Sequence, residues 1–208
     1  THLLQKALRI VLGDHVEQSG SYVSSDRLRF DFTHFSSMTS EEIDKVERMV
    51  NEIILQDMPV VTRVMKQDEA RKLGAMALFG EKYGDEVRVV TVGDLDSPYS
   101  MELCGGTHLT HSGQAGQFRI ISESGVASGI RRIEAVTGLA CYEMSKSDRE
   151  FIGEVSTALK VNKDQAVRKA EAMALEIKAL EKEIAELKKA NAGDVVGDAI
   201  SKATEING

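Results

Sequence analysis

The chain has 208 residues, a mass of 22.8 kDa and a formal charge of −7. This length excludes a large multidomain enzyme, and the acidic balance excludes a generally basic protein that coats DNA, so any contact with nucleic acid must come from a local basic face. The apolar stretches are shorter than the roughly 20 residues that span a bilayer, so we expect no membrane segment. Two cysteines, Cys104 and Cys141, without a disulfide-dense pattern favour a reducing, cytoplasmic location.

The first two thirds of the chain alternate between helical and strand patterns. Apolar residues at helical spacing predict a helix over residues 1–13, and polar and apolar alternation predicts a strand over 27–34. A second helix is expected over 40–56, where Thr39 or Ser40 can cap the first turn. Extended segments are expected at 60–65, 87–92, 118–122 and 130–136, with a helical turn at 68–73. This order predicts an α+β fold in which helices pack on a mixed or antiparallel sheet.

After about residue 147 the pattern changes to a heptad repeat. Its apolar positions step alternately by four and three residues, which predicts a long helix: either half of an antiparallel hairpin with residues 149–159, or a coiled coil. We interpret this seam as a scaffold or spacer and assign no chemistry to it. The seam consists of Ala166, Ala170, Met173, Ile177, Leu180, Ile184 and Leu187.

These patterns divide the chain into three parts. Residues 1–147 form the expected α+β domain, residues 148–190 a helical connector, and residues 191–208 a linker or the truncated start of a further domain. The chain begins inside a helical pattern without an initiator methionine, so we expect it to be a fragment of a longer protein.

The local motif that points most directly to chemistry is the run ELCGGTH at residues 102–108. A thiolate at Cys104 and an imidazole at His108, separated by three residues of which two are glycine, can converge on one ion, and zinc suits such ligands. The alternative is a buried cysteine beside a hydrogen-bonded histidine. His111 is a possible further ligand, and His2 starts a helix on which a partner four residues earlier would share its face.

Six segments, in the same order, resemble the editing domain of bacterial alanyl-tRNA synthetases. The resemblance covers residues 1 to about 145, and residues 149–190 resemble the helical connector that leads to the C-terminal domain of that family. Free-standing alanyl-tRNA editing proteins share the zinc motifs, but the segment at 74–83 and the helical tail are more similar to the synthetases. The six segments are THLL at 1–4, EQSGSYV at 17–23, RFDFTH at 29–34, GAMALFGEKY at 74–83, CGGTH at 104–108 and GIRRIEAVTG at 129–138.

The resemblance implies a zinc site. In the family, two histidines of an H-x-x-x-H motif on a helix and the C-x-x-x-H pair hold the metal. Carried over to this sequence, the ligands are His2, Cys104 and His108. The first histidine of the helical pair is absent, so we expect the fourth place to need water or another group.

The resemblance also implies a reaction, namely hydrolysis of the ester that joins a wrong amino acid, serine or glycine, to the acceptor end of tRNA(Ala). The whole enzyme would be an ATP-binding ligase of protein biosynthesis. To spare the alanine ester, the site should contain groups that hydrogen-bond the serine hydroxyl, and our candidates are Thr1, Gln18 and Ser21. The alternative for Gln18 and Ser21 is ordinary loop hydrogen bonding.

The tRNA end is expected to contact a local basic group. Arg131 and Arg132 form the best basic pair, with Lys82 as an addition. Neighbouring strand residues point to opposite faces, so at most one of the two arginines can face a given phosphate, and the other is expected to be a structural ion-pair partner.

A competing hypothesis from another class is a zinc-stabilised structural or oligomerisation module without turnover, in which the helical region mediates assembly. Four protein ligands and no open position would favour that reading, whereas a water-accessible position would favour catalysis. In either case the rest of the synthetase chain is an expected partner.

Overall fold

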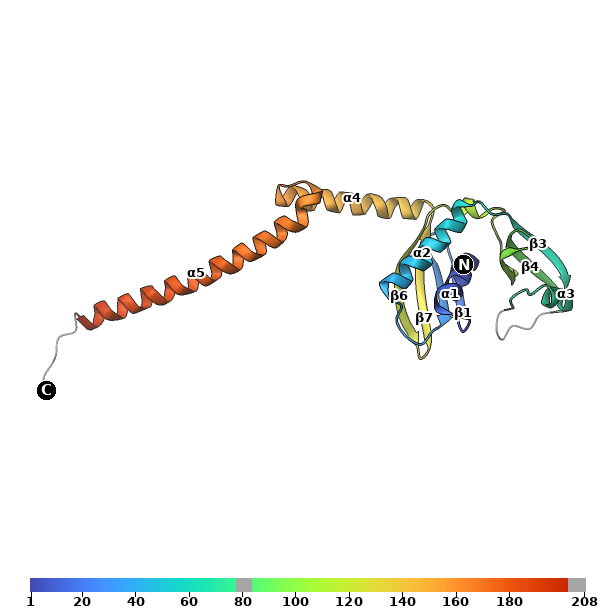
Figure 1. Cartoon of the computed structure of the whole chain (residues 1–208), viewed down its shortest axis with the longest axis horizontal. Coiled ribbons are helices and arrows are strands. Elements are labelled where there is room, and N and C mark those ends of the chain that lie inside the picture. Colours follow the sequence, from blue (N-terminus) through green and yellow to red (C-terminus); the bar gives the residue numbers. More distant parts are fainter. Residues whose placement is uncertain (78–83, 202–208) are drawn as a thin grey trace. The chain divides into compact units, whose positions relative to one another are not determined.

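The computed structural model describes residues 1–77 and 84–201 and divides into two compact units, Thr1–Ser145 and Lys146–Gly208. The first unit contains both sheets, and the second contains most of α4 and all of α5 (Figure 1). No helix in the described part of the chain has the length and apolar character needed to cross a membrane. The elements are α1 (His2–Leu12), β1 (Gln18–Val23), β2 (Leu28–Thr33), α2 (Ser40–Leu55), β3 (Val60–Lys66), α3 (Gln67–Lys72), β4 (Glu86–Gly93), β5 (Pro98–Leu103), η1 (Ser112–Ala115), β6 (Phe118–Ala127), β7 (Ile130–Thr137), α4 (Leu139–Leu159), η2 (Lys163–Gln165) and α5 (Ala166–Ser201).

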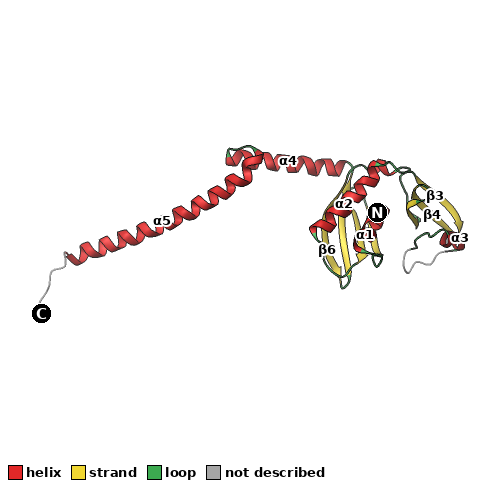
Figure 2. Ribbon diagram, viewed as in Figure 1, coloured by secondary structure: helices red, strands yellow, loops and turns green. Residues whose placement is uncertain are grey.

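The larger sheet is antiparallel with strand order β1-β2-β7-β6. Helices α1 and α2 pack against each other and, with the sheet, enclose the main core (Figure 2). Apolar and polar residues alternate along β2, so that one face of the strand contributes Leu28, Phe30 and Phe32 to the core. The residues between them lie on the other face and are more exposed. The opposite face of the same strands carries a charged pair, Asp31 with Arg132.

The predicted helices at 1–13 and 40–56 and the predicted strand at 27–34 are confirmed. Helix α2 begins with a capping box: the Thr39 hydroxyl accepts from the backbone N–H of Glu42, and the Glu42 carboxylate accepts from the backbone N–H of Thr39. This arrangement satisfies two backbone donors that a helix start otherwise leaves unpaired.

The smaller sheet is antiparallel with strand order β3-β4-β5. Its central strand β4 is buried at six of its eight positions and confirms the extended segment predicted at 87–92. Strand β5 is not among the strands predicted from the sequence. Its residues alternate between apolar and polar, but the structure buries the polar ones, Ser100 and Glu102. Both sheets with their packed helices confirm the predicted α+β class.

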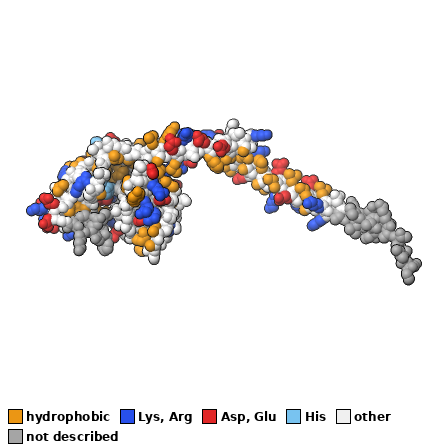
Figure 3. Space-filling view, turned by 180° about the vertical axis from the view of Figure 1, so that it is seen from behind, with side chains coloured by type: hydrophobic (Ala, Val, Ile, Leu, Met, Phe, Trp, Pro, Cys, Tyr) orange, Lys and Arg blue, Asp and Glu red, His pale blue; other side chains and the backbone are white. Residues whose placement is uncertain are grey.

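In the second unit, the long helix α5 runs from Ala166 to Ser201, beyond Asn191 where the sequence suggests a linker. From Met173 on, the side chains of the heptad seam are exposed, from 38% at Met173 to 58% at Leu187. An antiparallel hairpin would bury these side chains, so the described residues do not adopt that alternative. Figure 3 shows apolar and charged side chains mixed along one face of this helix.

Candidate functional site

Three side chains with metal-ligating atoms converge within the first unit. The ligand atoms of His2, Cys104 and His108 all lie within 4.8 Å of one another. His2 is the first residue of α1, and the other two belong to the loop that follows β5. His111 is elsewhere: its ring Nδ1 lies 3.2 Å from the carbonyl oxygen of Asp57. Among the described residues, the metal ligands proposed from the sequence thus form one group, His2, Cys104 and His108, which we call the His–Cys–His group.

The spacing of this group suits one small ion. The Nε2 atoms of His2 and His108 are 3.1 Å apart. Two nitrogen ligands on a tetrahedral zinc ion, each about 2.0–2.1 Å from the metal, lie about 3.3 Å apart. Burial lowers the pKa of His108, and the nearby His2 and Arg88 lower it further, which favours the neutral imidazole that binds metal ions. The donor set of two imidazoles and a thiol is typical of zinc.

The loop that carries Cys104 and His108 is held by Arg88 of β4. Its guanidinium donates to the carbonyl oxygens of Cys104 and Gly106, and the backbone N–H of Cys104 donates to the carbonyl of Arg88. A Cβ atom on Gly106 would lie 3.5 Å from Cys104 Sγ and 3.9 Å from His108 Cε1. The second glycine of the motif therefore faces the space between the two potential ligands, where a side chain would compete with an ion.

The sequence reasoning missed Glu102 as a functional residue. Its carboxylate oxygen Oε2 lies 2.5 Å from His2 Nδ1, and the side chain is almost fully buried. One signal was available, because a residue two positions before Cys104 on an extended strand lies on the same side as Cys104. No sequence signal indicated Arg88, since its role depends on the antiparallel pairing of β4 with β5.

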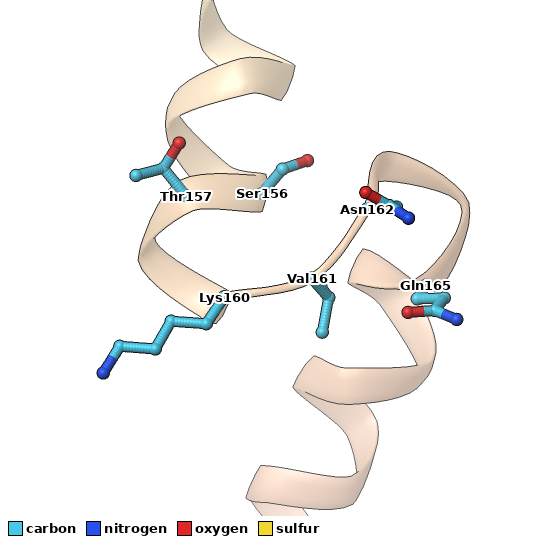
Figure 4. A pocket seen from close by; sticks show the side chains of 6 residues that line it. All are labelled: Ser156, Thr157, Lys160, Val161, Asn162 and Gln165. Carbon is cyan, nitrogen blue, oxygen red and sulfur yellow. The ribbon is translucent and has the colours of Figure 1, made fainter.

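A pocket of about 160 Å³ lies beside Glu102, between α1 and β5. Tyr99 lines this pocket, and burial raises the pKa of its phenol to about 12. Lys6 of α1 also lines it. A second hollow lies at the turn between α4 and α5 in the other unit and has no metal-ligating side chains; its lining consists of Ser156, Thr157, Lys160, Val161, Asn162 and Gln165 (Figure 4).

The structure places Gln18 and Ser21 on one face of β1. Regular alternation would put residues three apart on opposite faces, but the register shifts between Gln18 and Gly20, so Gln18 pairs with Phe32 and Ser21 with Phe30. Both phenylalanines point into the core beneath α1 and α2. The bulge thus turns both polar side chains toward the side of the sheet on which α1 lies. Thr1 is the N-cap of α1 but makes no side-chain cap hydrogen bond.

The two arginines of β7 lie on opposite faces, as the sequence alternation predicts. Arg131 pairs in register with Phe32 and thus shares the helix-covered face with Gln18, whereas Arg132 pairs with Asp31 on the other face. Both are in two-bond ion pairs: Arg131 with Glu123 at 2.5 and 2.7 Å, and Arg132 with Asp31 at 2.6 and 2.7 Å. The Arg132 guanidinium holds the pKa of Asp31 below its usual value.

Lys82, the third basic residue predicted to contact tRNA, lies outside the described residues. The segment at 74–83 is described only as far as residue 77, where the backbone of Met76 bridges to β5. Of the three basic residues predicted to contact tRNA, Arg131 thus shares a sheet face with the two substrate-recognition candidates Gln18 and Ser21, and Arg132 lies on the other face.

Comparison with known proteins identifies close relatives. The family model for the threonyl and alanyl tRNA synthetase second additional domain matches residues 87–134. Over 208 residues the chain is 55% identical to the alanine–tRNA ligase of Acetivibrio thermocellus, a match that covers all of this chain and 23% of the relative. The alanine–tRNA ligase of Fervidobacterium nodosum is 52% identical over 189 residues, which is 91% of this chain and 21% of the relative. That of Methylococcus capsulatus is 47% identical over 208 residues, which is 100% of this chain and 24% of the relative. The chain thus spans about a quarter of the length of these relatives.

Proposed function

Since the chain belongs to the alanine–tRNA ligase family and corresponds to a segment of its members, we propose that it hydrolyses the ester bond of tRNA(Ala) mischarged with serine or glycine, in the cytoplasm. The observation that carries this proposal is the His–Cys–His group, in which His2 of α1 meets Cys104 and His108 of the loop after β5. Two imidazoles and a thiol are the donor set that zinc prefers, so this group supports a metal-dependent site.

The donor set fits a zinc ion. The two imidazole Nε2 atoms lie at nearly the separation that zinc requires, and Cys104 adds a thiol. The Glu102 carboxylate contacts Nδ1 of His2, as carboxylates behind zinc-binding histidines do. When bound there, zinc would supply a Lewis acid for water or the ester carbonyl, or an anchor for the amino group of the substrate.

The protein residues contribute chiefly positioning and selectivity. An aminoacyl ester is already activated, so holding it correctly lowers much of the barrier to hydrolysis. Gln18 and Ser21 offer an amide and a hydroxyl on the sheet face toward α1, and Thr1 adds a hydroxyl beside His2. Groups that bond the serine hydroxyl are left unpaired by alanine, which penalises the correct ester. We assign no general base.

Arg131 is the arginine that we propose for contact with a tRNA phosphate. It lies on the same face as Gln18, with Phe32 between them on β2. Its pair with Glu123 uses two of the five guanidinium N–H donors, which leaves donors for a second anion. Arg132 instead serves the ion pair with Asp31 on the opposite face.

This assignment predicts different effects of the two substitutions. Arg131→Gln should raise the KM for mischarged tRNA and reduce the slope of log KM against log salt concentration by about 0.7, the value for one phosphate contact on a single strand. Arg132→Gln should leave both quantities unchanged and only lower the unfolding midpoint in urea, because Asp31 loses the nearer of its two cations and keeps only Arg29, whose Nε lies 3.9 Å away. Equal salt slopes in the two variants would contradict the assignment.

The direct test is hydrolysis of seryl-tRNA(Ala) and alanyl-tRNA(Ala) by the 208-residue chain, with the metal content of the same sample determined by elemental analysis. A second chain, extended upstream to include the histidine that the resemblance implies, is measured in parallel. We expect faster loss of serine than of alanine, and activity that rises with zinc content. Stoichiometric zinc without cleavage of either ester would contradict the proposal.

One observation favours a second candidate, a structural metal site. His2 belongs to a helix on the four-stranded sheet, whereas Cys104 and His108 follow the edge strand of the three-stranded sheet. A metal ion would thus join the two halves of the unit. If zinc raises the melting temperature while neither ester is cleaved, the chain is a zinc-stabilised module, and the exposed seam of α5 then becomes the place to look for oligomerisation.

A further inference from the structure

Glu102 is a buried carboxylate with few partners. It is 4% exposed and lies on β5. Its Oε1 accepts a hydrogen bond from the Ser100 hydroxyl at 2.6 Å, and its Oε2 lies 2.5 Å from His2 Nδ1. Burial of a carboxylate is costly unless hydrogen bonds compensate for the lost water. The contact with His2 is therefore part of what makes this position of Glu102 stable.

The contact engages the ring nitrogen of His2 that points away from His108. A carboxylate oxygen accepts hydrogen bonds, so the contact stabilises the ring form with the proton on Nδ1. In a neutral imidazole the other nitrogen, Nε2, then has a free lone pair. It is Nε2 that lies 3.1 Å from His108 Nε2, within the His–Cys–His group.

From this geometry we propose that Glu102 is a positioning residue for metal binding: it holds His2 in the Nδ1–H form and aims Nε2 at the position of the ion. The inference rests on the proposed metal-binding function. Ser100 and Glu102 lie on the same side of β5, two residues apart, so Ser100 fixes the carboxylate that in turn fixes the ring. Because Glu102 and His2 belong to different elements, the contact also fixes the start of α1 beside the loop of Cys104.

The first test is zinc affinity, measured by competition with a chromophoric chelator. Glu102→Leu removes the acceptor and should weaken zinc binding by about 10- to 100-fold, the usual cost of losing a carboxylate behind a ligating histidine. Glu102→Gln keeps an amide oxygen that can accept from Nδ1–H and should lose less. Glu86→Gln removes an exposed carboxylate at the start of β4 and serves as the control with unchanged affinity.

The second test is nitrogen NMR of the His2 ring in the metal-free protein. We expect the Nδ1–H form in the parent chain and in Glu102→Gln, and loss of that preference in Glu102→Leu. A merely structural Glu102 would lower the melting temperature without changing the ring form. If Glu102→Leu keeps both the zinc affinity and the ring form of the parent, the inference is overturned.

These readouts separate the inference from the proposed function. If the parent chain binds zinc but cleaves no ester, the editing proposal fails while the affinity series still decides the role of Glu102. If the parent chain hydrolyses seryl-tRNA(Ala) and Glu102→Leu binds zinc equally well, the role of Glu102 fails and the editing proposal stands. If the parent chain binds no zinc, the inference fails along with the metal site.

Discussion

Replacement of Cys104 by alanine is expected to remove zinc binding and ester hydrolysis together. Cys104 supplies the only thiol among the three converging side chains, and its loss leaves two imidazoles that share no further protein ligand among the described residues. The loss of zinc affinity should exceed the roughly 10- to 100-fold that the loss of an outer partner costs. It is measured by chelator competition, and hydrolysis of seryl-tRNA(Ala) is followed on the same preparation.

The matched control is Cys141→Ala, which removes the other free thiol of the chain. Cys141 is buried in α4 and its Sγ lies 3.0 Å from the carbonyl oxygen of Gln117, so this variant should lose stability and keep its zinc. Full hydrolysis by Cys104→Ala without bound metal would refute a role for zinc in the reaction.

Replacement of Gln18 by alanine is expected to reduce the discrimination between serine and alanine. A hydrogen bond to the serine hydroxyl is worth about 1–1.5 kcal/mol, and 1.4 kcal/mol is a factor of ten in rate or affinity. The kcat/KM for seryl-tRNA(Ala) should therefore fall about tenfold, whereas the slow hydrolysis of alanyl-tRNA(Ala) should not fall, because alanine no longer leaves the Gln18 amide unpaired. Both are measured in single-turnover assays at equal zinc content.

Ser25→Ala is the control for this prediction, because it removes a hydroxyl from the exposed turn of the same hairpin. Ser21→Ala extends the test, since the bulge places Ser21 on the face of Gln18. An equal fall in the rates for both esters would show that Gln18 acts on the common part of the substrate. If neither rate changes, Gln18 takes no part in the discrimination and has only a structural role in the edge strand β1.

The sequence by itself determined the elements with strong periodicity. The helices at His2–Leu12 and Ser40–Leu55 and the strand at Leu28–Thr33 follow directly from the spacing of their apolar residues, because the buried face of each element repeats at its own period. The motif of Cys104 and His108 was also visible, since both residues lie within one loop and local spacing limits how far apart they can be.

The tertiary structure alone decided which distant residues share the site. Local spacing could not show that Glu102 faces His2 or that Arg88 holds the loop, because both contacts cross between elements far apart in the chain. Nor could it show that Gln18 and Ser21 share a face, since a single extra residue in β1 reverses the alternation that the sequence suggests. Our proposal of Arg131, and not Arg132, for the phosphate contact depends on the same strand register. In it, Arg131 shares the face of Phe32 and Arg132 shares the face of Asp31.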